Sequence, residues 1–156
     1  MSEFAELTEF VLFNRKSLFS FPITQQNQQT LETLSMATFK KFEDIQAWQK
    51  AREVTRLVYS MSNGENFAKD FGLRDQMKRA SVSIMANIAE GHGRRTSTEF
   101  ANFLNIARGS AIEVQSHLYV ALDLNYINQP EFDKIYEMLE EISRMTISLA
   151  QYLRKN

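Results

Sequence analysis

Two side chains stand at a spacing that could hold a metal ion. Glu113 and His117 are four residues apart, so on a helix they would share one face. Helical bundles that carry a di-iron centre use Glu-x-x-His motifs on two helices, and this motif does not occur in the chain. The chain has only two histidines and no cysteine, too few ligands for an ordinary transition-metal site. We therefore expect a surface hydrogen bond or ion pair between the two residues, and no metal site.

A second group of side chains could bind phosphate. His92, Arg94 and Arg95 come just before a predicted helix start, where backbone N–H groups favour an anion. They could contact a nucleotide or the phosphates of RNA. They do not form a P-loop, because the Gly-x-x-x-x-Gly-Lys pattern and its preceding strand are missing. The alternative, which we favour, is a solvated loop in which Arg94 or Arg95 bonds to carbonyl groups near Glu90.

The first predicted helix carries another group of basic residues. Arg52 and Arg56 lie with Gln49 on one side of it, and the pair Lys40-Lys41 precedes it. An ordinary solvated face explains them equally well, because acidic residues are interspersed. The residues considered for nucleic-acid contact are therefore His92, Arg94, Arg95, Arg52 and Arg56.

A catalytic site would need a cleft with an acid and a base in contrasting environments. The sequence offers polar residues beside small ones, and ion pairing explains them more simply. Antiparallel helices would place Glu113 opposite Arg74, and Arg108 near Asp75. We predict no catalytic residue, no cofactor and no enzymatic activity. The polar residues concerned are Asn87, Glu90, Arg108 and Glu113.

Helical periodicity begins near residue 40 and predicts four helices that position these groups. The first begins at Asp44 as N-cap and ends at Asn63-Gly64. The second runs from about Leu73 to Glu90, with Gly91 as a C-cap at positive φ. Their short connections predict an all-α, antiparallel up-down-up-down four-helix bundle.

The third and fourth helices carry their own start signals. Thr96 stands three residues before Glu99, which is a capping box, and this helix reaches about Asn125. The fourth helix begins at Pro130, with Gln129 as N-cap.

The third helix has two stripes at helical spacing, so we predict two sets of neighbours. One stripe faces the core of the same chain. The second would be an exposed apolar patch on a monomer, which predicts an oligomer. Other helices of the bundle could instead cover both stripes. The core stripe is Phe100, Phe103, Leu104, Ala107, Ala111, Val114, Leu118, Ala121 and Leu122, and the predicted oligomer interface is Ile106, Gly109, Ser110, Val120 and Leu124.

The 156 residues have a net charge of −1, which gives no overall attraction to nucleic acid or to membranes. The absence of cysteine and of a long apolar run fits a cytoplasmic protein without a membrane span. Residues 1–35 hold five of the twelve phenylalanines and the tract QQNQQT. We predict a poorly ordered extension over 1–38 and the bundle over 39–156. Met36 is a second candidate for the translational start, and a chain beginning there should keep its thermal stability.

Three blocks of sequence resemble a known family. They are KFEDIQAWQKAR, LRDQMKRASVSIMANIAEGHGRRTSTEF and FLNIARGSAIEVQSHL. They resemble the four-helix-bundle proteins encoded in intervening sequences of 23S rRNA genes, and the resemblance covers residues 39–154. It implies a homopentamer and no catalytic residues. A relative, the accessory variability protein of diversity-generating retroelements, is a basic pentameric barrel that binds nucleic acid and its reverse transcriptase. This chain is nearly neutral, unlike that relative.

These observations lead to one favoured hypothesis and two alternatives. We favour a non-enzymatic oligomeric scaffold, which the resemblance connects with RNA, DNA or a reverse-transcriptase-like protein. The first alternative is a structural or protein-binding oligomer without nucleic-acid affinity. The second is a small-molecule or metal enzyme.

Overall fold

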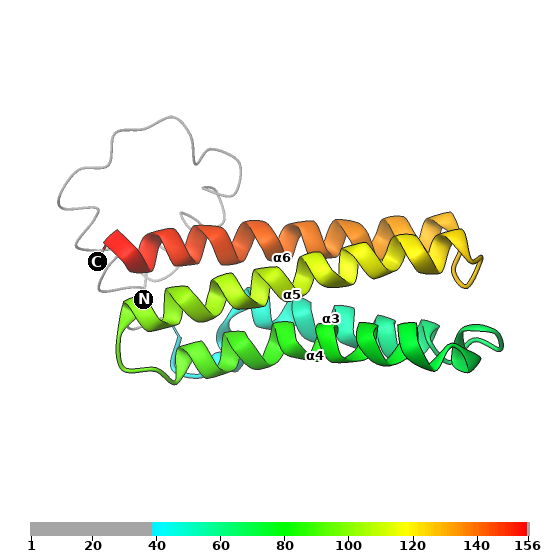
Figure 1. Cartoon of the computed structure of the whole chain (residues 1–156). Coiled ribbons are helices and arrows are strands. Elements are labelled where there is room, and N and C mark those ends of the chain that lie inside the picture. The colour runs from blue at the N-terminus through cyan, green and yellow to red at the C-terminus, as the bar shows by residue number, and fades with distance from the viewer. Residues whose placement is uncertain (1–38, 156) are drawn as a thin grey trace, which may run out of the picture. The chain divides into compact units, whose positions relative to one another are not determined.

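The computed structural model describes residues 39–155, so the expectations for residues 1–38 lie outside the part described. Four long helices fill this part: α3 (Gln46–Met61), α4 (Phe71–His92), α5 (Ser97–Asp123) and α6 (Gln129–Lys155). Two short 3-10 helices, η2 (Phe42–Asp44) and η3 (Phe67–Lys69), precede α3 and α4. Within residues 39–155 there is no strand, so the all-α prediction is confirmed (Figure 1). Each long helix packs against the next in sequence, and α3 also packs against α6.

Two helix starts differ from the prediction. Asp44 lies inside η2, where its carboxylate accepts from the Lys41 N–H at 3.2 Å, and Ile45 is the N-cap of α3. At α6 the capping residue is Asn128. Its Oδ1 accepts from the Glu131 N–H, and the Glu131 carboxylate accepts from the Asn128 N–H, both at 2.9 Å. Gln129 as N-cap is therefore wrong, because the shorter amide one position earlier forms a complete capping box.

Gly91 is not the C-cap at positive φ that was predicted. The α4 helix continues through Gly91, which is buried, and ends at His92, with Gly93 as C-cap at a φ of −77°. No described glycine has a positive φ, so the backbone at Gly91 does not require glycine. A Cβ atom there would lie 2.7 Å from Phe100 Cδ2 and 2.7 Å from Phe103 Cβ. Glycine is needed because α5 approaches α4 too closely for any side chain.

Thr96 begins α5, as predicted. Its Oγ1 accepts from the Glu99 N–H at 3.2 Å. The Thr96 hydroxyl also donates to the Glu99 carboxylate at 2.7 Å, where the capping box predicted a bond to the Thr96 amide. The connection between α4 and α5 is short, because α4 ends at His92 and α5 begins at Ser97. Backbone and side-chain hydrogen bonds define both of its ends.

The core lies along the axis between the four helices. Most of the predicted stripe of α5 is buried, although Phe103 and Leu122 are only half-buried. On α3, Ala47 and Ala51 are buried, whereas Trp48 is half-buried. The largest side chains with almost no exposure are Phe67, Ile45, Met77, Ile84, Ile88, Leu104, Leu118, Leu139, Ile142, Val54, Val58 and Val114.

Asp70 joins two loops at one end of the bundle. Its Oδ1 caps α4 by accepting from the Leu73 N–H at 3.0 Å, and its Oδ2 accepts from the Tyr126 hydroxyl at 3.4 Å. The Tyr126 ring stacks on Phe67 with centroids 5.0 Å apart. Burial and the neighbouring Asp70 carboxylate raise the pKa of the Tyr126 hydroxyl.

Removal of this carboxylate should cost stability. We expect Asp70→Ala to lower the free energy of unfolding by about 1–2 kcal/mol, because an N-cap and a bond between loops are lost together. Chemical denaturation measures the change. Asp123→Ala is the control, because Asp123 is exposed at the C-terminus of α5, where a negative charge is not favoured. Equal losses in the two variants would contradict the role of Asp70.

Across the described residues, no helix combines the length and the apolar composition needed to cross a bilayer.

Candidate functional site

Two of the three basic side chains around the α4–α5 loop are already engaged. His92 is half-buried, and its Nε2 donates to the Phe39 carbonyl at 2.9 Å. Arg94 forms an ion pair with Glu90, and its guanidinium lies 4.6 Å from the centroid of the Phe103 ring. Arg95 is exposed and bonds to no other residue within 39–155. We favoured a loop in which Arg94 or Arg95 bonds to carbonyl groups near Glu90. Arg94 does bond at Glu90, but to its carboxylate rather than to a carbonyl group.

The basic residues of α3 lie beside aromatic rings. Arg52 lies 5.9 Å from the centroid of the Trp48 ring. Arg56 is exposed, with no hydrogen bond or ion pair to the described part of the chain. Both arginines line a shallow hollow of about 290 Å³, together with Trp48, Gln49 and Glu53. One side of α3 therefore presents unpaired positive charge next to an aromatic ring.

A larger groove of about 540 Å³ lies between α3 and α6. Four of its seven charged side chains are paired: Lys50 forms an ion pair with Glu141, and Arg144 lies 3.7 Å from Glu140. Charges that neutralise each other leave little field to attract a charged ligand. This groove therefore gives no support to a catalytic interpretation.

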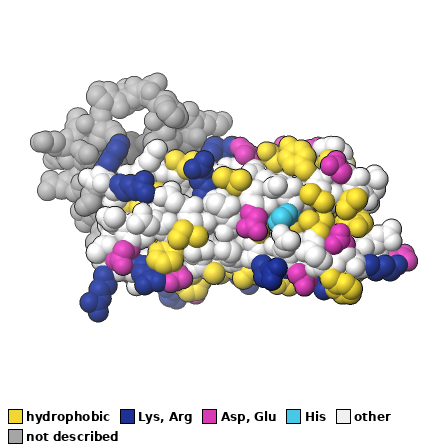
Figure 2. Space-filling view, viewed as in Figure 1, with side chains coloured by type: hydrophobic (Ala, Val, Ile, Leu, Met, Phe, Trp, Pro, Cys, Tyr) yellow, Lys and Arg dark blue, Asp and Glu magenta, His cyan; other side chains and the backbone are white. Residues whose placement is uncertain are grey.

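The outer face of α5 is apolar on the side nearer α4. Ile106, Val120 and Leu124 have 52%, 43% and 50% of their surface exposed. A Cβ at Gly109 would meet none of the described atoms within 4 Å. We call Ile106, Gly109, Val120 and Leu124 the α5 strip. Hydrophobic side chains are visible over α5 and α4 in Figure 2.

The fifth predicted interface residue, Ser110, has a different place. It is 8% exposed, and its hydroxyl lies 2.9 Å from that of Ser83 on α4. It therefore belongs to the contact between α4 and α5. Two exposed apolar residues of α5, Ile112 and Tyr119, were missing from the prediction. They lie between the two stripes on the side of α6, where Tyr119 packs edge-on against Phe132. Successive residues of a helix are turned by about 100° around its axis, so their positions could have been worked out from the sequence.

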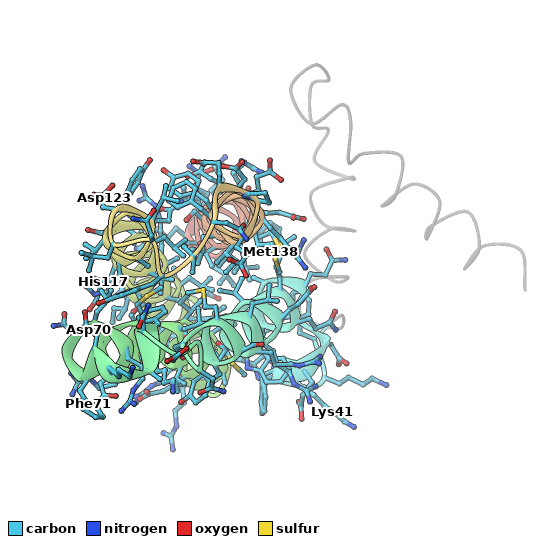
Figure 3. The ribbon with its side chains drawn as sticks, turned by 90° about the vertical axis from the view of Figure 1, so that its right-hand side faces the viewer. Lys41, Asp70, Phe71, His117, Asp123 and Met138 are labelled. Atoms are coloured by element: carbon cyan, nitrogen blue, oxygen red, sulfur yellow. The ribbon has the colours of Figure 1, made fainter. Side chains whose placement is uncertain are left out.

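Glu113 and His117 lie within ion-pair distance on α5, but they form no hydrogen bond, because the buried His117 Nε2 has no hydrogen-bond partner among the described residues. Glu113 Oε1 lies 3.6 Å from His117 Nε2, and Figure 3 shows His117 beside the seam between α5 and α4. Among residues 39–155, no three metal-binding side chains come together.

The predicted pairs with Arg74 and Asp75 are wrong. Arg74 bonds to Asp75 and to the Ala68 carbonyl instead. The contact between Ser83 and Ser110 sets the register of α4 against α5. Glu113 is one turn beyond Ser110, so it lies level with Ala80, more than a turn away from Arg74. Residue spacing alone had placed α5 too far along α4.

Comparisons with known proteins agree with this architecture. The family model of the 23S rRNA-intervening sequence protein matches residues 43–148. A crystal structure from Bacteroides thetaiotaomicron, described as a protein with unknown function from the S23 ribosomal protein family, is similar to the chain with a TM-score of 0.61. Its sequence is 30% identical, and the match covers 67% of this chain and 97% of that one. No curated protein sequence matches the chain. The chain thus belongs to the 23S rRNA-intervening sequence protein family.

Proposed function

We propose that the protein is a non-enzymatic scaffold that self-assembles in the cytoplasm and binds nucleic acid or a nucleic-acid enzyme. Its fold would be an antiparallel up-down-up-down bundle, and its assembly a homopentamer. The observation that carries self-assembly is the α5 strip, whose Ile106, Val120 and Leu124 are apolar and exposed on one side of the helix. Soluble monomers seldom leave such a surface uncovered.

Gly109 adds an independent argument. A glycine within a helix costs about 1 kcal/mol relative to alanine. At Gly91 a close contact within the chain accounts for the glycine, but at Gly109 the surrounding space is open. A neighbouring copy that approaches Gly109 as closely as α5 approaches Gly91 would account for the second glycine. The α5 strip is therefore the surface on which we place the contact between copies.

The ring size has a separate basis. The number five comes from the family resemblance. A head-to-tail contact between identical chains closes without free ends only in a cyclic ring, which is compatible with five copies. In such a ring each basic surface recurs in every copy, so modest local charge becomes multivalent.

A structural or protein-binding oligomer without nucleic-acid affinity is the second candidate. It is favoured by the engagement of His92 and Arg94 within the chain and by the net charge of −1. An enzyme is less well supported, because Lys50 and Arg144 in the groove between α3 and α6 are paired with Glu141 and Glu140.

Light scattering on the purified protein tests self-assembly directly. The expected species at micromolar concentration has five times the 18.1 kDa mass of the chain. A species of 18.1 kDa would overturn the proposal, and a dimer or tetramer would overturn only the ring size. Identification of the nucleic acid and protein that copurify from the native host distinguishes the scaffold from the second candidate.

A further inference from the structure

We infer that single-stranded nucleic acid binds along the outer seam of α3 and α4. The surface consists of Trp48, Arg52, Arg56, Tyr59 and Lys78, which we call the aromatic–basic strip. The inference rests on the proposed function, and it names both the class of nucleic acid and the surface that receives it.

The strip places two cations, Arg52 and Arg56, between two rings along one side of α3. Trp48, Arg52 and Tyr59 are separated by four and seven residues, so they lie on one side of the helix. Lys78 reaches over from α4, and its Nζ lies 4.9 Å from the centroid of the Tyr59 ring. From Trp48 to Tyr59 the strip runs roughly 16 Å along the helix axis, at about 1.5 Å per residue.

Both rings can accept a base, and the cations can accept phosphates. Tyr59 is 44% exposed, and Trp48 is half-buried against Phe42 with its ring bordering the hollow. A base that stacks on Trp48 takes the place of Arg52, and a base that stacks on Tyr59 takes the place of Lys78. Each displaced cation is then free to bind the adjacent phosphate. Arg56 needs no such exchange, because it has no partner among residues 39–155.

This pattern favours a single strand over a duplex. Aromatic rings next to a positively charged track bind single strands by stacking on bases of any sequence. In a duplex the base faces are covered by their neighbours, so the two rings would gain nothing from it. The α4–α5 loop lacks this combination, because its ring at Phe103 is covered by Arg94, which is paired with Glu90.

The strip is separate from the α5 strip. In the cross-section of Figure 3, α3 lies between α4 and α6, and α5 lies diagonally across the bundle from it. A copy that docks on α5 would therefore leave the seam of α3 and α4 open. Assembly and nucleic-acid binding can then be tested independently.

The chain provides its own probe, because Trp48 is its only tryptophan. We would titrate the full-length protein with 15-nucleotide oligo(dT) and oligo(rU) and follow tryptophan fluorescence. Saturable quenching by either oligomer is expected, and the difference between them shows whether DNA or RNA is preferred. An abasic oligomer of equal length should bind at least fivefold more weakly and cause little quenching, because stacking on each ring is lost.

Variants separate the roles of ring and charge, with labelled oligo(dT) and fluorescence anisotropy as the readout. Tyr59→Ala should weaken binding about fivefold or more without changing its salt dependence. Arg56→Ala should reduce the slope of log affinity against log salt by about 0.7, the value for one phosphate on a single strand. Glu53→Gln should tighten binding, because Glu53 is the acidic residue that lines the hollow. Arg108→Ala is the control, because Arg108 is an exposed arginine on α5.

Several results would overturn the inference. One is binding of the oligomers without quenching of Trp48 fluorescence. Another is equal quenching by poly-glutamate, which would indicate an acidic protein partner. A third is an equal effect of Arg56→Ala and Arg108→Ala on binding. Absence of any binding by the assembled protein would also overturn it. Light scattering on the same sample reports assembly separately, so failure of this inference is distinguishable from failure of self-assembly. Circular dichroism confirms that each variant is folded.

Discussion

Gly91→Ala is expected to lower the free energy of unfolding of the bundle by about 1–3 kcal/mol, the range for overpacking a filled core. In an exposed helix the same change would raise it by about 1 kcal/mol. The new methyl group would lie 2.7 Å from the Phe103 Cβ atom. A Cβ atom cannot move without its backbone, so α5 must shift away from α4. The clash therefore outweighs the gain in helix propensity.

Gly109→Ala is the matched control for this prediction. It is the same substitution in a helix interior, but the added methyl group enters open space. In the isolated chain it should raise the free energy of unfolding by about 1 kcal/mol. Chemical denaturation at several protein concentrations measures both variants, because assembly adds a stability that depends on concentration. Destabilisation of equal size in the two variants would show that the approach at Gly91 is not the cause.

The second large effect concerns assembly. Gly109→Leu should convert the oligomer into a species of 18.1 kDa at concentrations where the unchanged chain is assembled. The added side chain would occupy the space that we assign to a neighbouring copy. Because a Cβ at this position meets no described atom within 4 Å, the fold of the single chain should tolerate it. Light scattering measures the mass, and circular dichroism should show unchanged helix content.

Gln151→Leu is the control for the assembly prediction. It also adds an exposed leucine, but on α6 and outside the α5 strip. Its mass should equal that of the unchanged chain. If Gly109→Leu keeps the full mass, the contact between copies does not pass through Gly109, and the assignment of the α5 strip must be abandoned.

The sequence predicted the helices well because their signals are local. The apolar stripes identified four helices, and the spacing of Thr96 and Glu99 located the start of α5. Asn128 and Glu131 form an equally readable box, but the rule that favours proline at the first helical position drew the prediction to Gln129. At α6 the local rules therefore failed because two of them competed.

The errors at Gly91 and at the ion pairs have another origin. A glycine near a helix end suits a left-handed cap and a close helix contact equally well, and only the position of Phe103 on the facing helix distinguishes them. The ion pairs depended on register, which the contact between Ser83 and Ser110 determines. Both are properties of two helices together, and periodicity within one helix contains no information about them.

The two surfaces were predicted only in part, because they too depend on how neighbouring helices pack. Periodicity found the α5 strip but could not show that Ser110 is covered by α4. It found Arg52 and Arg56 on α3 but not Lys78, which joins them from the neighbouring helix. Residues that share a surface across two helices become visible only when the helices are placed.

The short connection between α4 and α5 also bears on the order in which the bundle forms. Closing a short loop costs little chain entropy, and contacts between neighbours in sequence form early. The α4–α5 hairpin is therefore the natural first unit to form. The seam between α3 and α6 joins the two ends of the described chain, so it closes last. In the native state that seam should open most often, and amide hydrogens along the ends of α3 and α6 should exchange with solvent before those at the contact around Gly91.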